Sequence, residues 1–284
     1  MIISGKDLAR EVRENIARKV ASYRIEYGRE PNLCVILVGD DPNSHTYVRG
    51  KGKAAQEVGF SHTELLLPDT ITEHELIDRI HELNNDDSVD GILVQLPLPK
   101  HIRKHRVIEA IDPNKDVDGF HSRNVDALWH KLPGVRACTP KGIIKLLDKA
   151  GVEIAGRHAV VIGRSNIVGF PVAKMLLDRN ATVTIAHSHT ADLGAITRQA
   201  DILVVAIGVP KLIKGDMVKE GAAVIDVGIS HDPETGKLSG DVDFAEVEPK
   251  ASVITPVPGG VGPMTIACLM ENTLDCYTRK MQWD

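Results

Sequence analysis

Hydrophobic positions recur with a helical period at the start of the chain. In residues 4–23, "SGKDLAREVRENIARKVASY", an apolar residue returns at every fourth position from Leu8 to Val20. This spacing places the apolar side chains on one face of a helix. Ser4 followed by Asp7 resembles a capping box, which marks a helix start. The segment is therefore predicted to be an amphipathic helix.

After this helix the pattern changes to short apolar runs separated by helix-length polar segments. In order along the chain we expect a strand at "NLCVILVG", a helix over 43–58 ended by Gly59, a strand at "TELLLP", a helix from Thr72 and a strand at "DGILVQLPLP". Thr72 with Glu75 forms the second capping signal. Continuous apolar strands between helices are typical of a parallel sheet with helices on its faces.

A junction follows at "ACTPKGIIKLLDKAG", where Thr139 caps a helix, Pro140 suits its first turn and Gly151 ends it. A second alternating series then begins, with strands at "HAVVIG", "ATVTIAH", "DILVVAIG" and "AVIDVGI". The pattern predicts an α/β protein with two α/β domains. We expect the domains to cover 1–138 and 139–284, the second of Rossmann type, with the final helix packing back on the first.

The stretch "AVVIGRSNIVGFPVAKML" reads as a strand, a glycine turn and a helix, the arrangement that holds a dinucleotide phosphate. Its glycines, Gly163 and Gly169, are spaced G-x-x-x-x-x-G instead of G-x-G-x-x-G. Such a turn also occurs as a tight corner that binds nothing. The polar run Arg164, Ser165, Asn166 favours a binding function, because it aims a cation at the helix start.

The end of the next strand indicates which nucleotide is bound. Proteins that prefer NAD place an acidic residue there to accept from the ribose 2′-hydroxyl. Here the strand ends "TIAHSHT", with His187 and Ser188 and no acid. Arg164 and Ser188 suit a 2′-phosphate, which an acid would repel. We therefore expect NADP as the cofactor.

Composition narrows the class of protein. Of 284 residues, 43% are hydrophobic and 26% charged, the balance of a soluble globular protein. The net charge of −5 argues against a nucleic-acid partner, and no apolar run has the length of a membrane span. The charged start lacks a signal-peptide core, and the four cysteines form no C-x-x-C pair or zinc-ligand spacing. We expect a cytoplasmic protein with reduced thiols, no bound metal and a small-molecule partner.

Three segments of the first half carry polar residues in unusual settings. Tyr47 and Lys51 are four residues apart in "HTYVRGKGKAA" and share a helix face. Gln95 ends the apolar strand "GILVQLPLP", where parallel sheets bind ligands. Asp118 lies in the loop "DPNKDVDGFH". Taken singly, each has an ordinary structural reading as a core aromatic, a surface charge, a satisfied amide or a turn former.

Together these segments resemble one family. The stretches "YVRGKGKAAQEVGF", "DGILVQLPLP", "DVDGFH", "GRSNIVGFP" and "ITPVPGGVGPMT" occur in this order over nearly the full length. They resemble the bifunctional methylenetetrahydrofolate dehydrogenase/methenyltetrahydrofolate cyclohydrolase family. The resemblance implies NADP-dependent oxidation of 5,10-methylenetetrahydrofolate and hydrolysis of the methenyl product to 10-formyltetrahydrofolate. It also implies a homodimer, a role in one-carbon metabolism and purine biosynthesis, and a folate site in the cleft between the domains.

The resemblance also assigns roles to residues. It implies a catalytic Lys51 with Gln95 as its partner, Tyr47 stacking on the pterin and Asp118 binding the pterin edge. The folate-binding residues that it implies are Tyr47, Lys51, Gln95, Asp118, Pro258, Gly259 and Gly260, with Gly262 in the same segment. The nucleotide-binding residues that it implies are Gly163, Arg164, Ser165, Ile167, Val168, Gly169, His187, Ser188 and Ile229.

The two reactions make different demands on these side chains. Hydride transfer depends mainly on alignment, whereas hydrolysis requires proton transfer. Lys51 is the available group, because burial and a cationic substrate lower the pKa of a lysine toward the useful range. Gly50 and Gly52 flank Lys51 and predict a looser helical turn there.

One loop and two alternative functions complete the prediction. We expect "VITPVPGGVGPMT" to be a rigid loop, and its prolines and those of "LPLP" are candidates for cis peptide bonds. A shikimate-type NADP dehydrogenase and a nucleotide-sensing protein without turnover remain as alternatives. Formation of NADPH from methylenetetrahydrofolate distinguishes the three.

Overall fold

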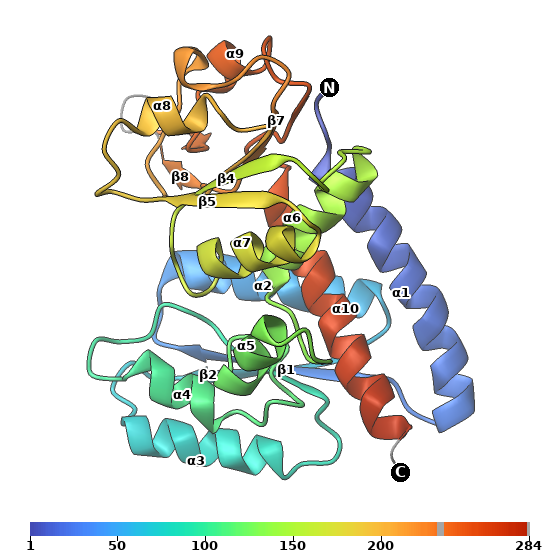
Figure 1. Cartoon of the computed structure of the whole chain (residues 1–284). Helices are drawn as coiled ribbons and strands as arrows, with labels where there is room; N and C mark the ends of the chain where they lie inside the picture. The colour runs from blue at the N-terminus through green and yellow to red at the C-terminus, as the bar shows by residue number, and fades with distance from the viewer. Residues whose placement is uncertain (232–235, 283–284) are drawn as a thin grey trace. The chain divides into compact units, whose positions relative to one another are not determined.

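The computed structural model describes residues 1–231 and 236–282 and consists of two compact units (Figure 1). The five-stranded unit contains Met1–Ala9 and Thr139–Thr265, and the three-stranded unit contains Arg10–Cys138 and Ile266–Asp284. The boundary between the two units along the sequence lies between Cys138 and Thr139. The nine N-terminal residues group with the second half of the chain, an arrangement that the sequence analysis did not anticipate.

The three-stranded unit is built on a parallel sheet of order β2-β1-β3. Its strands are β1 (Asn32–Val38), β2 (Ser61–Leu67) and β3 (Gly91–Val94). The central strand β1 is buried from Leu33 onward, which explains its uninterrupted apolar sequence. Its side chains pack with those of β3 and of helix α3 (Glu73–Asn84), including Leu76 and Ile80, to form the core.

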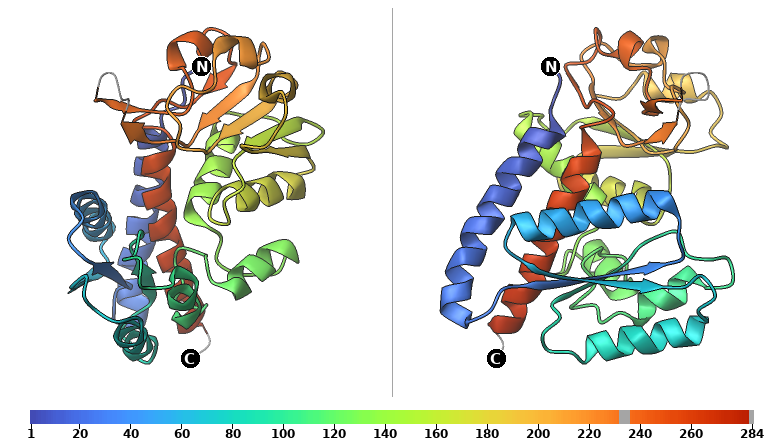
Figure 2. Two further views of the ribbon diagram at one scale, coloured as in Figure 1. Left: turned by 90° about the vertical axis from the view of Figure 1, so that its left-hand side faces the viewer. Right: turned by 180° about the vertical axis from the view of Figure 1, so that it is seen from behind.

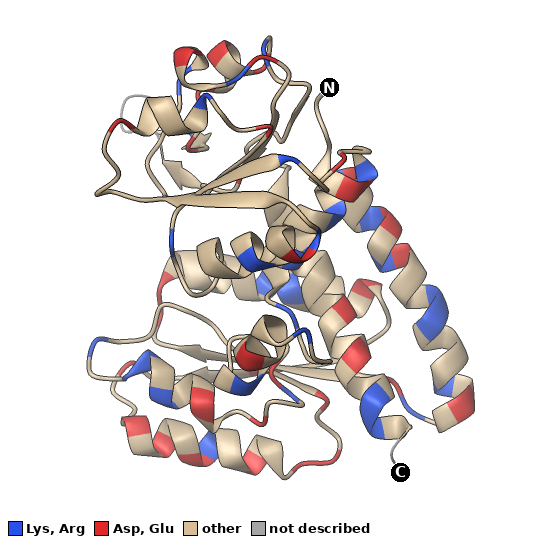
Figure 3. Cartoon of the chain, in the orientation of Figure 1, with Lys and Arg blue, Asp and Glu red and all other residues tan. Residues whose placement is uncertain are grey.

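The helices of this unit begin where their sequences signal a start. Helix α3 has a complete capping box between Thr72 and Glu75. Helix α2 (Pro42–Glu57) is capped by Asp41 and has proline in its first turn. The unit also contains α4 (Lys104–Ala110), α5 (Ser122–Trp129), most of α1 (Gly5–Tyr27) and most of α10 (Val261–Met281). Figure 3 shows charges of both signs along α1.

The five-stranded unit has an all-parallel sheet of order β10-β7-β6-β4-β5. Its strands are β4 (His158–Ile162), β5 (Thr182–Ala186), β6 (Ile202–Val205), β7 (Ala223–Asp226) and β10 (Val253–Ile254). Between these strands lie α7 (Gly169–Asp178), α8 (Leu193–Thr197), the 3-10 helix η1 (Gly215–Met217) and α9 (Phe244–Val247). Helix α6 (Cys138–Lys149) precedes β4. Figure 2 shows this sheet with α7 beside β4 and β5.

The structure confirms the α/β class and the parallel sheets. It corrects the interpretation of 253–265 as a loop. The segment contains β10, and α10 begins at Val261, so that Gly262 and Pro263 lie in the first helical turn. Proline is tolerated there because first-turn N–H groups have no intrahelical partner. Two cis peptide bonds, Leu96–Pro97 and Val257–Pro258, lie in the proline segments considered above.

The short elements β8 (Ser230–His231) and β9 (Leu238–Ser239) pair antiparallel. Neither these strands nor α4, α5 and α9 were predicted from the sequence. Among the described residues, no helix is both long enough and apolar enough to span a bilayer.

Candidate active site and nucleotide turn

Two elements of the three-stranded unit bring Lys51 and Gln95 together. Lys51 lies on α2, and Gln95 directly follows β3, where its backbone N–H still bonds to Ile36. The Lys51 Nζ donates to Gln95 Oε1 at 2.8 Å. The Gln95 Nε2 donates to the Leu96 carbonyl at 2.7 Å, which orients the amide with its oxygen toward the lysine. The sequence-predicted pair is therefore assembled across 44 residues.

The surroundings of Lys51 favour the neutral form of its amine. Burial lowers the pKa of the Lys51 ammonium, while Asp118 and Cys138 oppose that change by raising it. Burial prevails because removing an ammonium from water disfavours its charged form. Gln95 is neutral and provides one acceptor without providing a counter-charge. This setting suits a lysine that gives up and takes back a proton more readily than an exposed one.

Asp118 is the charged group opposite Lys51. Burial raises the pKa of this carboxyl to about 6, Lys51 lowers it and Asp116 raises it. Both Lys51 and Asp118 are thus shifted toward their neutral forms, although each attracts the charged form of the other. Desolvation outweighs their mutual attraction. No hydrogen bond joins the Asp118 side chain to any residue that the structure describes, so its oxygens are available to a ligand.

Tyr47 lies one turn before Lys51 on α2, as the spacing predicted. Its side chain is 50% exposed, unusually high for a tyrosine at a sheet-packed helix. A ring with this exposure is available to cover the face of a planar ligand.

The glycines beside Lys51 do not interrupt the helix, because α2 is continuous across both. Gly52 is buried, and a Cβ there would lie 2.8 Å from His62 Nε2 on β2. Glycine at 52 therefore allows the imidazole to approach the helix. At Gly50 a Cβ would make only an ordinary contact with Ile266. The packing of Gly52 gives a reason for its presence that the sequence did not reveal.

In the five-stranded unit, the turn between β4 and α7 brings two backbone segments very close. Gly163 has φ +118°, and a Cβ there would lie 2.3 Å from the Ala206 carbonyl oxygen. A Cβ on Gly169 would lie 2.2 Å from the Gly163 carbonyl oxygen. Only glycine fits either position. The longer glycine spacing thus encloses a compact turn at a helix N-terminus, where backbone N–H groups attract anions.

The polar residues of this turn have separate tasks. The Ser165 Oγ accepts from the backbone N–H groups of Val168 and Gly169, so it satisfies two N–H groups at the start of α7. Arg164 is exposed, and the described part of the chain places no acidic group within ion-pair distance of it. An exposed guanidinium at the start of a helix is well placed for a phosphate. Ile167 and Val168 are half-buried in the same turn.

The next strand delivers its polar residues to the same edge of the sheet. Ile162 of β4 is paired with Ala186 of β5, so Gly163 and His187 follow directly from neighbouring strand ends. His187 is half-buried, and Ser188 is exposed. The His187 backbone N–H donates to Thr190 Oγ1 at 2.8 Å, which turns the chain at this point. The edge carries Arg164 and Ser188 and no acid at the strand end.

The structure adds two buried carboxylates that the sequence analysis missed. Asp226 ends β7 and accepts from the N–H groups of Gly228, Asp241 and Val242. Asp241 accepts from Ile207 and Gly208. Burial raises the pKa of Asp226 to about 7. These carboxylates fix the loops after β6 and β7, and the acid in the apolar strand "AVIDVGI" was the sequence signal for the first.

Ile229, Pro258, Gly259 and Gly260 line one shallow pocket of the five-stranded unit. Gly259 has φ +107°, and its carbonyl accepts from the Lys6 N–H at 3.1 Å. Pro258, Gly259 and Gly260 therefore lie in the same unit as the nucleotide turn, whereas Tyr47, Lys51, Gln95 and Asp118 lie in the other.

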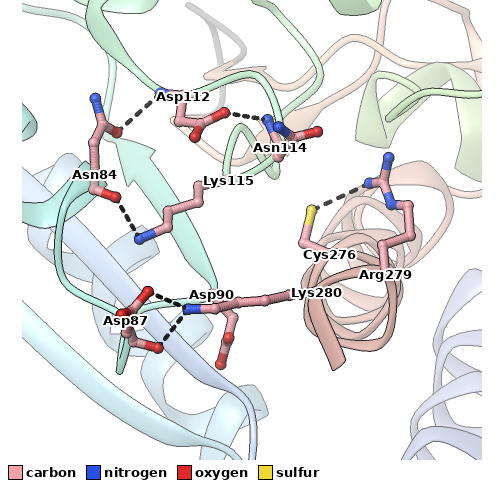
Figure 4. Close-up of a pocket in the computed structure, with 9 residues that line it drawn as sticks. All are labelled: Asn84, Asp87, Asp90, Asp112, Asn114, Lys115, Cys276, Arg279 and Lys280. Carbon is pink, nitrogen blue, oxygen red and sulfur yellow. Dashed lines mark hydrogen bonds and ion pairs between the residues drawn. The ribbon is translucent and has the colours of Figure 1, made fainter. Parts of the chain in front are cut away.

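A larger polar cavity, about 240 Å³, lies elsewhere in the three-stranded unit. Figure 4 shows its lining residues, with the α10 side chains facing those of the loops after α3 and α4. They are Asn84, Asp87, Asp90, Asp112, Asn114, Lys115, Cys276, Arg279 and Lys280. Lys115 donates to the carbonyls of Leu83, Asn84 and Asp86, so it secures the end of α3. Lys115 therefore has a structural role.

Comparison with known proteins places these features in one class of enzyme. Residues 3–118 match the tetrahydrofolate dehydrogenase/cyclohydrolase catalytic domain, and residues 137–281 match the NAD(P)-binding domain of the same enzymes. The chain thus has a catalytic and a nucleotide-binding domain. It belongs to the tetrahydrofolate dehydrogenase/cyclohydrolase family.

Individual relatives are similar over the whole chain. The sequence is 60% identical to the bifunctional protein FolD of Halothermothrix orenii over 96% of both chains. The structure resembles the bifunctional FolD enzyme of Campylobacter jejuni, with a TM-score of 0.96, 50% identity and 99% coverage of both chains. It also resembles the Trypanosoma brucei FolD enzyme, solved with NADP cofactor and inhibitor, with a TM-score of 0.95, 40% identity and coverage of 99% and 98%.

The alternative shikimate-type assignment has much weaker support. Shikimate 5-dehydrogenase of Thermus thermophilus shares 16% identity and a TM-score of 0.53 over 86% of this chain and 98% of the other. That likeness reflects a common fold.

Proposed function

We propose that the chain catalyses NADP-dependent oxidation of 5,10-methylenetetrahydrofolate to the methenyl compound and hydrolysis of that product to 10-formyltetrahydrofolate. The observation that carries the proposal is the Lys51–Gln95 pair at 2.8 Å, facing Asp118 in a chain whose two domains both match this family. A proton-transfer group and a carboxylate anchor thus occur together where the family places its catalytic domain.

The nucleotide turn fits NADP. Its glycines admit a phosphate close to the backbone, and Arg164 has no acidic partner within the described residues. We assign nucleotide binding to Gly163, Arg164, Ser165, Ile167, Val168, Gly169, His187, Ser188 and Ile229. Bound NADP supplies the hydride acceptor. The charge and hydroxyl of Arg164 and Ser188 favour the 2′-phosphate, because charge-assisted hydrogen bonds are stronger than neutral ones.

Asp118 and Tyr47 are the proposed anchors of the pterin. An ionised carboxylate accepts two parallel hydrogen bonds from the 2-amino and ring N–H groups, and the exposed ring of Tyr47 covers the pterin face. Alignment is the main requirement of hydride transfer. We also assign Pro258, Gly259 and Gly260 to folate binding.

Lys51 is the proposed acid–base group of hydrolysis. A water oxygen adds to the methenyl carbon, and its proton passes to the neutral amine of Lys51. The resulting ammonium then donates the proton to the ring nitrogen as its bond to that carbon breaks, and the hydroxyl group on the carbon releases its remaining proton to solvent as the formyl C=O forms. Gln95 accepts from Lys51 in either state and keeps the Nζ oriented, without adding the negative charge that would hold the proton there.

We further propose that the enzyme is a cytoplasmic homodimer whose product supplies one-carbon units for purine biosynthesis. Within the described residues the four cysteines are buried and form no disulfide, which agrees with a reducing compartment. Val209, Leu212 and Leu238 expose 46%, 40% and 45% of their surface in the five-stranded unit and offer an apolar area for a second copy. Sedimentation equilibrium at several concentrations tests the dimer.

The test of the function measures the two reactions separately. Purified protein with methylenetetrahydrofolate and NADP is expected to form NADPH, and protein with methenyltetrahydrofolate alone is expected to accelerate loss of methenyl absorbance. Shikimate with NADP serves as the control substrate and is expected to give no NADPH. Absence of both folate reactions, with NADP still bound, would instead indicate a nucleotide sensor.

A further inference from the structure

The position of Asp118 has to be fixed by its backbone. Its side chain makes no hydrogen bond to the described residues, and it is half-buried. A carboxylate that must accept two parallel N–H groups requires accurate placement, since small displacements weaken both bonds. The contacts of the neighbouring residues therefore decide where Asp118 points.

One side of this backbone is held by Asp116. Its side chain is 2% exposed and accepts from the N–H groups of Gly119 at 3.1 Å and His121 at 2.9 Å. It also accepts from Asn124 Nδ2 at 2.9 Å. The carboxylate of Asp116 thus folds the chain around Asp118 into a closed loop. These contacts are local in sequence.

The other side is held by Asn272 on α10. Its side chain is 1% exposed, and its Nδ2 donates to the carbonyls of Val117 and Arg136, both at 2.9 Å. An amide nitrogen has two hydrogens, one for each carbonyl. Cys138 Sγ adds a weaker bond to the Val117 carbonyl at 3.3 Å. Asn272 therefore ties the residue just before Asp118 to a separate segment of the chain.

The same two segments meet again at Gly119. This residue has φ +73°, and a Cβ there would lie 2.7 Å from the carbonyl carbon of Arg136 and 2.8 Å from the nitrogen of Ala137. The loop is thus in direct backbone contact with 136–137 immediately after Asp118. Asn272 bridges the two segments immediately before it.

We propose that Asn272 is a positioning residue for folate recognition, acting through the Val117 carbonyl to place the Asp118 carboxylate against the pterin edge. The inference rests on the proposed function, and it adds a residue from the C-terminal helix to the folate site. Asn272 does not contact the substrate. It removes the freedom of the loop that carries the contact.

The direct test is Asn272→Leu, which keeps a similar volume and removes both donors. Loss of alignment is expected to raise the KM for methylenetetrahydrofolate about 10- to 100-fold, a size known for small misplacements at binding sites. At saturating folate, kcat is expected to stay within about threefold, because the lost interaction is uniform binding. NADP affinity is expected to be unchanged. Hydrogen exchange of the 116–121 amides should become faster.

Thr273→Val is the matched control. Thr273 is the next residue on α10 and is fully buried, and among the described residues its hydroxyl donates only to the Leu269 carbonyl of the same helix, at 2.9 Å. This variant removes one buried hydrogen bond and leaves the hydrogen bonds of the Asp118 loop in place. It is expected to keep the wild-type folate KM and the wild-type exchange of 116–121.

Asn272→Ser provides a milder variant, since one hydroxyl hydrogen serves at most one of the two carbonyls. We expect a smaller KM increase with the same unchanged NADP affinity, and this variant decides the matter if the leucine protein does not fold. A normal folate KM in the folded variants, or an equal increase in Thr273→Val, would overturn the positioning role. Failure of the wild-type protein to turn over folate would contradict the proposed function instead, while exchange of 116–121 would still report on the loop.

Discussion

Lys51 and Lys115 belong to the same three-stranded unit, and burial lowers the pKa of both. Their hydrogen bonds differ. Lys115 donates to three backbone carbonyls at 2.7 to 3.0 Å, which uses every N–H of its ammonium. Lys51 donates only to Gln95 within the described residues. A lowered pKa alone therefore does not identify a catalytic lysine. The two lysines are distinguished by the number of ammonium N–H donors that remain available to a ligand.

The largest expected effect is at Lys51. Lys51→Met keeps most of the apolar side chain and removes the amine, so cyclohydrolase turnover is expected to fall about 10²- to 10⁴-fold, the usual contribution of an acid–base group. Dehydrogenase turnover should fall much less, because it depends on alignment. Steady-state assays of both reactions, with folate affinity measured in parallel, check this. A parallel loss of both activities at unchanged affinity would remove Lys51 from the proton-transfer role.

Lys115→Met is the reciprocal experiment. It removes one donor from each of three part-buried carbonyl oxygens, of which Leu83 and Asp86 keep a backbone N–H donor. We therefore expect a loss of about 1–3 kcal/mol in the free energy of unfolding, the cost of about one unsatisfied polar group. The folate KM and both turnover numbers of the folded protein should stay near wild type. Denaturant unfolding measures the first quantity and kinetics the second. A large loss of cyclohydrolase activity without loss of stability would contradict the contrast between the lysines.

Arg164 is a third cation that can be compared with the two lysines. It has no acidic partner among the described residues, so its N–H donors are available to a ligand. Arg164→Ala is expected to weaken NADP binding roughly 10- to 150-fold, because a charged hydrogen bond contributes about 1.5–3 kcal/mol. NAD affinity should change little, since NAD lacks the 2′-phosphate. Titration of both nucleotides measures the difference. Equal losses would show that Arg164 does not distinguish them.

The smallest effect concerns the charge of Asp118. Because its pKa is raised to about 6, the carboxylate gains a proton as the pH falls below that value. Folate affinity is therefore expected to decrease about five- to sixfold from pH 6 to pH 5 and to be nearly constant above pH 7. The contribution of Asp118 to the free energy of unfolding changes with pH in the opposite direction to its contribution to folate binding. A raised carboxyl pKa stabilises the fold below its unfolded value near 3.8, and that contribution is lost as the pH rises through 6.

Asp118→Asn separates this titration from others. The amide has one acceptor oxygen, so folate should bind weakly at every pH, and the decrease between pH 6 and pH 5 should disappear. Folate binding to the wild-type and Asp118→Asn proteins, measured by fluorescence at pH values from 5 to 7, tests this expectation. Persistence of the same pH dependence in Asp118→Asn would assign it to another group.

Local signals predicted the elements that local interactions form. The Thr72–Glu75 capping box and the apolar strand β1 are formed by residues close in sequence, so both were predicted from the sequence. Lys51 and Gln95 were predicted as a pair through the family resemblance. Their spacing alone would not have joined them, because 44 residues separate them and the sheet connection brings them together.

Contacts over long sequence separations were not predictable in this way. Asn272 reaches Val117 across 155 residues, and nothing in the helical pattern of α10 distinguishes it from other buried polar residues. Asp241 supports the loop after β6 across 34 residues. The glycine at 52 depends on the imidazole of another element. Each of these contacts joins segments that are distant in sequence and adjacent in the fold. The local sequence pattern of either segment does not indicate which other segment it will contact.

The first nine residues carry a consequence for the genetics of the protein. They belong to the five-stranded unit, where Ile3 bonds to Ile254 at 2.9 Å and the terminal ammonium of Met1 bonds to Ser252 at 2.7 Å. A gene fragment beginning at codon 139 therefore encodes the nucleotide-binding unit without one of its own segments. Exchange of this unit between relatives as a single cassette would also leave that segment behind. A permuted gene that joins codons 1–9 to the rest of the unit would encode it whole.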